Sequence, residues 1–145
     1  MKISEEIVKV ALNNNICINT LHNRESEEIK KNIYKKYIKS KSGIFLWEQF
    51  NNPAIITDSD GWKIVCNFIS DNRCLMFFDN AEDKSIILIN NGEELKILLS
   101  EMFGFEFYVT NYETDYILCF NHHDCMLGCG KAKKWIESLK QSMKL

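Results

Sequence analysis

The sequence predicts an α+β fold in which a mostly antiparallel sheet of hairpins, with about five or six strands, is packed by N-terminal, middle and C-terminal helices. Three patterns predict it. Residues 92–102 show helical periodicity, two apolar runs at 73–79 and 85–90 flank a polar loop, and 105–127 alternate strand-like and turn-like segments. No Pro- or Ser-rich linker interrupts the 145 residues, so we expect a single α+β domain spanning 1–145.

Two amphipathic helices are expected in the first forty residues. The first covers residues 5–13, with Ser4 as its N-cap and an apolar stripe made of Ile7, Val8, Ala11 and Leu12. Asn23 is expected to cap the second, in which Ile29, Ile33 and Tyr37 recur at helical spacing. The lysines between them are interpreted as a solvated face and not as a nucleic-acid surface.

The middle of the chain is expected to alternate between helix and strand. Residues 44–47 are apolar and fit either a short strand or a docked loop, and the pattern leaves both open. Asp58 and Asp60 cap a helix whose buried face includes Trp62. The runs at 73–79 and 85–90 are apolar on both faces, which is typical of interior strands covered by helices.

The C-terminal third is expected to hold a helix, a three-stranded meander and a last helix. The first helix begins at a cap formed by residues 90–92 (Asn-Asn-Gly), and Gly104 is predicted to take the left-handed position after its end. Strands follow at 105–110, 115–120 and 125–127. The final helix presents one continuous apolar stripe, formed by Ala132, Trp135, Ile136, Leu139 and Met143.

Charge is unevenly distributed along the chain. Residues 42–130 contain fourteen Asp or Glu against four Lys or Arg, while the whole chain carries a net charge of −2. This acidic centre argues against nucleic-acid binding and favours a basic protein partner. The candidate partner-binding residues are the acidic side chains Asp79, Glu82, Asp83, Glu106, Glu113 and Asp115.

The location expected from the sequence is the cytoplasm. The start of the chain lacks the basic and apolar regions of a secretory leader, and no apolar run is long enough to span a membrane. The six cysteines are therefore expected to be reduced thiols. Most of them are interpreted as small buried hydrophobic residues.

A polar turn between the last two strands is the most suggestive motif. Asn121, His122, His123 and Asp124 form a candidate polar site, and Cys119, His122, Cys125 and Cys129 are an alternative set of zinc ligands. A loop of two or four residues would divide the three thiols between faces, whereas a three-residue loop at 122–124 would place them on one face. We expect no cofactor, with zinc as the alternative.

Two further chemical hypotheses concern this region. A histidine oriented by Asp124 could activate Cys119 or Cys125 as a nucleophile, although neighbouring strand positions rarely converge. The segment from Gly128 to Lys131 could hold an anion or a carboxylate at a helix N-terminus. We assign no catalytic residue.

The segments GFEFY (104–108) and NHHD (121–124) resemble a group of small uncharacterised bacterial proteins. In size and element order the chain is also similar to the α+β immunity proteins that accompany bacterial toxins. This resemblance implies a nonenzymatic binding protein that neutralises a basic toxin, such as a nuclease. The alternatives are a metal-binding protein or enzyme centred on 121–124, and a small-molecule or peptide sensor with a pocket lined by Trp47, Trp62 or Tyr108.

Overall fold

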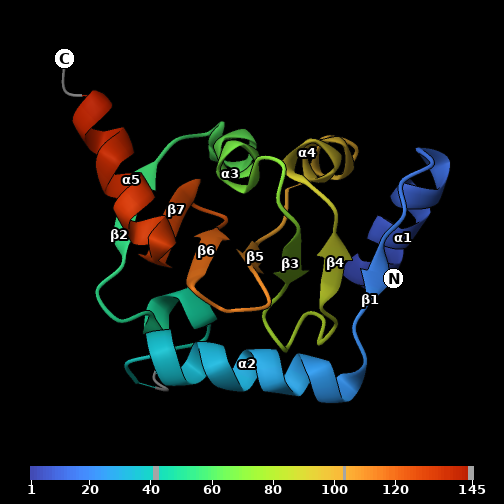
Figure 1. Cartoon of the computed structure of the whole chain (residues 1–145), viewed down its shortest axis with the longest axis horizontal. Coiled ribbons are helices and arrows are strands. Elements are labelled where there is room, and N and C mark those ends of the chain that lie inside the picture. The colour runs from blue at the N-terminus through green and yellow to red at the C-terminus, as the bar shows by residue number, and fades with distance from the viewer. Residues whose placement is uncertain (41–42, 103, 144–145) are drawn as a thin grey trace.

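The computed structural model describes residues 1–40, 43–102 and 104–143. Within them, seven strands form one sheet in the order β1-β4-β3-β5-β6-β7-β2, and every neighbouring pair is antiparallel (Figure 1). The strands are β1 (Asn19–Thr20), β2 (Ala54–Thr57), β3 (Cys74–Phe77), β4 (Ile87–Ile89), β5 (Phe107–Thr110), β6 (Tyr116–Phe120) and β7 (Cys125–Gly130). The α+β class is confirmed, although the expected five or six strands are seven.

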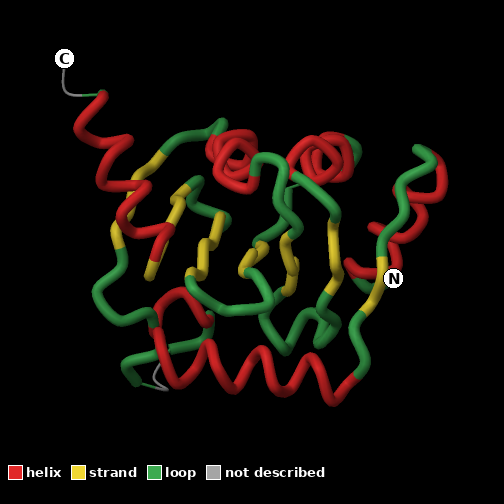
Figure 2. Tube along the Cα trace, in the orientation of Figure 1, coloured by secondary structure: helices red, strands yellow, loops and turns green. Residues whose placement is uncertain are grey.

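Helices cover both faces of this sheet (Figure 2). They are α1 (Ile3–Asn13), α2 (Asn23–Tyr37), α3 (Gly61–Ile69), α4 (Gly92–Ser100), α5 (Lys131–Ser142) and a short 3₁₀ helix, η1 (Leu46–Gln49). In Figure 1 the strands form a row with α2 below it and with α3 and α4 above it. The strands β3, β5 and β6 are buried along their whole length, as their apolar composition on both faces predicts.

The core consists of two clusters, one on each face. Met76, Phe107 and Leu118 pack with residues of α1, α3, α4 and α5. The alternate positions of the same strands, such as Phe77 and Ile117, pack with residues of α2 and η1. Because successive strand residues point to opposite faces, one apolar run supplies both clusters.

The two strands that the sequence analysis missed lie at the sheet edges. β1 has two residues and pairs with β4, and β2 pairs with β7 through Ala54↔Gly128 to Thr57↔Cys125. Neither has the length or alternation that predicts a strand. Each is extended because a neighbour distant in the sequence offers unpaired backbone groups.

Several local expectations were wrong. Asn23 is the first residue of α2 and not its cap, which is His22. Ser4 is not an N-cap, because it lies inside α1, where its backbone N–H donates to Asp83 Oδ2 at 2.9 Å. Val8 and Leu12 are exposed, so the buried stripe of α1 is formed by Ile7 and Ala11. α4 ends at Ser100 with Glu101 as its C-cap, so Gly104 does not directly follow the end of the helix as expected.

Candidate functional site

The β6–β7 turn has the three-residue loop that the sequence left open as one of two registers. Cys119 lies opposite Leu127, and the Asn121 N–H donates to the Cys125 carbonyl at 3.0 Å. The loop therefore comprises residues 122–124. Asp124 has a φ of 58°, which is the left-handed conformation that commonly ends a three-residue hairpin loop.

Asn121 holds this turn from inside the protein. Its side chain is 3% exposed, and its Oδ1 accepts the backbone N–H groups of His123 and Cys125, each at 3.0 Å. The Asp124 carbonyl accepts the N–H of Asp58 at 2.9 Å, which ties the loop to the segment after β2. Asn121 therefore has a structural role, and the two histidines are left exposed at the tip of the turn.

The observed register places Cys119, Cys125 and Cys129 on one face of the sheet. Cys119 and Cys129 are buried in the core cluster on the α2 side. Burial raises the pKa of Cys129 to about 11 and raises that of Cys119 well above its usual range, so both stay protonated at neutral pH. Within the described residues, no three His, Cys, Asp or Glu side chains converge as metal ligands.

The short helix η1 resolves the expectation left open for residues 44–47. Its first backbone N–H groups are bound by side chains of the sheet: Leu46 donates to Asp79 Oδ1 at 2.7 Å, and Trp47 donates to the Tyr108 hydroxyl at 3.0 Å. The same hydroxyl donates to the Asp79 carboxylate at 3.1 Å. Burial raises the pKa of Asp79, although hydrogen bonds from Leu46 and Tyr108 oppose that rise.

Docking of η1 brings four rings together, which we name the aromatic–histidine surface: Phe45, Trp47, His122 and His123. Phe45 stacks on Trp47 at 5.7 Å between ring centroids, and Trp47 meets both histidines edge-on, at 6.2 Å and 6.1 Å. Both histidines are exposed, while Phe45 and Trp47 are half-buried. Two segments separated by more than seventy residues thus form one partly apolar surface.

Glu106 holds two of these rings, those of Trp47 and His122. Its Oε2 accepts the Trp47 indole N–H at 3.2 Å and the His122 backbone N–H at 2.9 Å, and it contacts His122 Nδ1. His122 therefore faces Glu106, and not Asp124 as a catalytic triad would require. This contact fixes the orientation of the imidazole but leaves its far edge in solvent.

The six acidic candidates lie on three segments of the chain, at 79–83, 106 and 113–115. Four of them accept hydrogen bonds within the protein: Asp79, Asp83, Glu106 and Asp115. Glu82 and Glu113 are exposed and lie in different loops. The structure therefore uses much of the acidic centre as internal acceptors for backbone and side-chain donors.

The N-terminus of α5 is also occupied from within the chain. Lys131 Nζ pairs with Asp115 Oδ2 at 2.9 Å, and the Lys131 backbone N–H donates to the Asp115 carbonyl at 3.1 Å. Gly130 has a φ of 67° and lies against that carbonyl. Asp115 thus partners the side chain of Lys131 and the first amide of α5, where the sequence suggested an anion or a carboxylate partner.

Sequence reasoning missed the contribution of Phe45 to this site. The signal available was a cluster of aromatic residues directly after Gly43, in a segment too short for a regular element. Trp47 and Glu106 were noted for other reasons, and nothing local indicated that both would contact His122. Their association depends on where η1 docks.

The chain belongs to a family of unknown function (DUF6756), whose family model matches residues 1–140. No curated protein and no solved structure matches it. Within the described residues, no helix combines the length and apolar character needed to cross a bilayer.

Proposed function

We propose that this protein is a nonenzymatic binding protein of immunity type, which neutralises a basic toxin domain, such as a nuclease, in the cytoplasm. The aromatic–histidine surface is the docking site. The observation that carries this proposal is a surface made of two half-buried aromatic rings, Phe45 and Trp47, and two exposed histidines. Glu106 holds Trp47 and His122 in place, and Trp and other aromatic residues dominate the binding energy of protein interfaces.

Charge indicates the kind of partner. The exposed acidic side chains Glu48 and Asp124 belong to the two segments that form the surface. An apolar centre with acidic neighbours favours a basic partner, since opposite charges at the rim accelerate association. The net excess of acidic residues in 42–130 acts in the same direction.

A nonenzymatic role is supported by the chemistry of the turn. A thiol nucleophile needs a deprotonated sulfur within reach of a base, and burial keeps Cys119 and Cys129 protonated. All six cysteines are free thiols, which agrees with a reducing compartment. His122 Nδ1 is engaged with Glu106, so this imidazole orients the surface.

The test uses wild-type protein and Trp47→Ala as parallel baits for affinity capture from the source cells. A protein retained by wild type alone is then expressed by itself and together with each variant. We expect it to be basic, to arrest growth when expressed alone, and to be neutralised by wild type. Trp47→Ala should bind it about 30-fold more weakly, as loss of an interface hot spot predicts.

Tyr112→Ala is the matched control, because Tyr112 is an exposed aromatic residue outside this surface. It should neutralise the partner as wild type does. The proposal fails if the wild-type and Trp47→Ala baits retain the same proteins. It also fails if the partner retained by wild type alone is acidic or does not arrest growth.

A further inference from the structure

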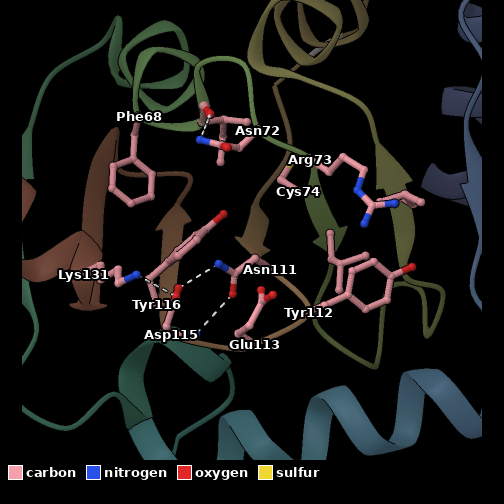
Figure 3. A pocket seen from close by; sticks show the side chains of 13 residues that line it. Phe68, Asn72, Arg73, Cys74, Asn111, Tyr112, Glu113, Asp115, Tyr116 and Lys131 are labelled. Atoms are coloured by element: carbon pink, nitrogen blue, oxygen red, sulfur yellow. Dashed lines mark hydrogen bonds and ion pairs between the residues drawn. The ribbon is translucent and has the colours of Figure 1, made fainter.

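A pocket of about 570 Å³ opens at the end of β6 that is opposite to the aromatic–histidine surface (Figure 3). It is half-open and is bounded by the end of α3, the start of β3, the β5–β6 turn and the first residue of α5. Its volume falls in the range of roughly 300–1,000 Å³ that is usual for small-molecule sites. Nothing in the proposed docking role uses this pocket.

The turn that forms one wall of the pocket is firmly held by α2. Lys36 Nζ donates to the Thr114 hydroxyl and to the Glu113 carbonyl, both at 2.9 Å, and the Tyr37 hydroxyl donates to the Thr114 carbonyl at 2.8 Å. Thr114 is fully buried with a φ of 49°. The wall is therefore preformed and needs little ordering when a ligand enters.

Tyr116 extends across this pocket with its hydroxyl directed into it (Figure 3). The residue is only 6% exposed, and its ring is held edge-on by Phe68 at 4.9 Å between centroids. No described residue forms a hydrogen bond with its hydroxyl, and the oxygen is not sealed from solvent. Burial raises the pKa of Tyr116, with further contributions from Cys74, Asp115 and Glu113, so the hydroxyl remains a donor at neutral pH.

Arg73 supplies a positive charge that is not neutralised. Its guanidinium lies over the Tyr112 ring at 5.5 Å from the centroid, and no described carboxylate forms an ion pair with it. The other cation of the pocket, Lys131, is held by Asp115, whose carboxylate also accepts the Asn111 amide at 2.7 Å. An entering anion would therefore meet the guanidinium of Arg73 and not the lysine.

We propose that this pocket binds a small organic carboxylate with a flat apolar body. The Arg73 guanidinium and the Tyr116 hydroxyl receive the carboxylate, since a guanidinium matches its planar geometry. The ring of Phe68, which also lines the pocket, receives the apolar body. Glu113 and Asp115 make the pocket as negative as it is positive, which disfavours anions of higher charge, such as inorganic phosphate.

The test is calorimetric titration of the intact protein with 3-phenylpropionate, its neutral analogue 3-phenyl-1-propanol, and inorganic phosphate. We expect saturable binding of the carboxylate only, with a dissociation constant on the order of 1 mM or tighter. Arg73→Gln should weaken this binding roughly tenfold or more, and Tyr116→Phe should weaken it several-fold. Because Tyr116→Phe removes an unpartnered hydroxyl, its melting temperature should equal that of wild type.

Arg24→Gln is the matched control, since Arg24 is the other arginine of the chain and is exposed on α2, outside the pocket. It should bind 3-phenylpropionate as wild type does, and so should Trp47→Ala. The proposal is overturned if the carboxylate shows no saturable binding, if the alcohol or phosphate binds as tightly, or if Arg73→Gln binds with unchanged affinity. Capture of a protein partner is unaffected by any of these results.

Discussion

The indole N–H of Trp47 donates a 3.2 Å hydrogen bond to the carboxylate of Glu106, and this contact joins η1 to the segment that leads into β5. The same carboxylate oxygen accepts the backbone N–H of His122. One side chain thus positions both halves of the aromatic–histidine surface. The surface therefore depends on the docking of η1 as much as on the residues that it exposes.

Removal of the Tyr108 hydroxyl should loosen η1. Tyr108→Phe leaves the backbone N–H of Trp47 without its acceptor. It also removes the hydroxyl that donates to the half-buried Asp79 carboxylate. We expect the free energy of unfolding to fall by about 1–3 kcal/mol, the cost of leaving buried polar groups unpaired. Urea unfolding measures this change, and hydrogen exchange should show faster exchange at the amides of Leu46 and Trp47.

Tyr112→Phe is the control for this prediction, because the Tyr112 side chain is exposed and its ring contact with Arg73 survives the change. Its stability and exchange rates should equal those of wild type. Equal stability of Tyr108→Phe and wild type would show that η1 is held by other contacts.

Close contact between α3 and α4 requires a glycine at position 92. A Cβ on Gly92 would lie 2.1 Å from the carbonyl oxygen of Cys66, and its N–H already donates to the Ser70 carbonyl at 2.7 Å. Gly92→Ala must separate two backbones, so we expect a loss of about 1–3 kcal/mol or more in the free energy of unfolding. Thermal and urea unfolding measure it.

Gly104→Ala provides the matched comparison, since nothing lies within 4 Å of a Cβ built at Gly104. This variant should unfold at the same urea concentration as wild type, or a slightly higher one. A Gly92→Ala protein as stable as Gly104→Ala would contradict the close approach of the two helices.

The thiols should differ in their reaction with iodoacetamide at neutral pH. Cys17 is exposed and should react first, and Cys125 is half-buried and should react slowly. The other four thiols should resist, because burial removes access and raises their pKa values, to about 11 for Cys129 and about 12 for Cys66. Mass spectrometry counts the adducts on the folded protein, with urea-unfolded protein as the fully reactive control. Rapid labelling of Cys119 in the folded state would argue for an accessible, nucleophilic thiol.

Acid stability should depend on Asp83. Burial alone would raise the pKa of this carboxyl, but hydrogen bonds from Ser4 and Ser85 outweigh it and lower the pKa below 3.8. Its stabilising contribution is therefore complete above pH 3.8 and is lost as the pH falls through the lower value of the folded state. Urea unfolding between neutral and acidic pH should show a shallower loss of stability for Asp83→Asn than for wild type.

Asp79 should change stability with pH in the opposite direction to Asp83, because burial raises the pKa of Asp79 in the folded protein. The penalty of burying its ionised form is present at neutral pH and is relieved as the pH falls through the raised pKa. Asp79→Asn should therefore lose more stability than wild type on acidification. If Asp79→Asn and Asp83→Asn lost the same free energy of unfolding on acidification, the burial and hydrogen bonds of these two carboxylates would not control their ionisation.

Much of the fold could be predicted because its signals are local. The spacing of Leu95, Leu98 and Leu99 after a cap at 90–92 predicts α4, and the structure confirms the helix. The N-cap is Asn91, whose side chain accepts the Glu94 N–H. The three-stranded meander of β5, β6 and β7 was also predicted, since turns of Asn, Asp and Thr separate its strands. Each of these features depends on residues within one turn or one hairpin of each other.

Tertiary structure alone decided the edge strands and both sites. β2 is extended because β7, about seventy residues later, offers it a partner. Arg73 and Tyr116 face one pocket only because β3 and β6 flank β5 in the sheet, and Trp47 reaches His122 only because Asp79 and Tyr108 bind η1. The sequence by itself determined which segments become helix or strand, through side-chain periodicity and turn chemistry. Contacts between distant segments leave no such local pattern, so the sheet order and the burial of acidic acceptors emerged only when the chain was folded.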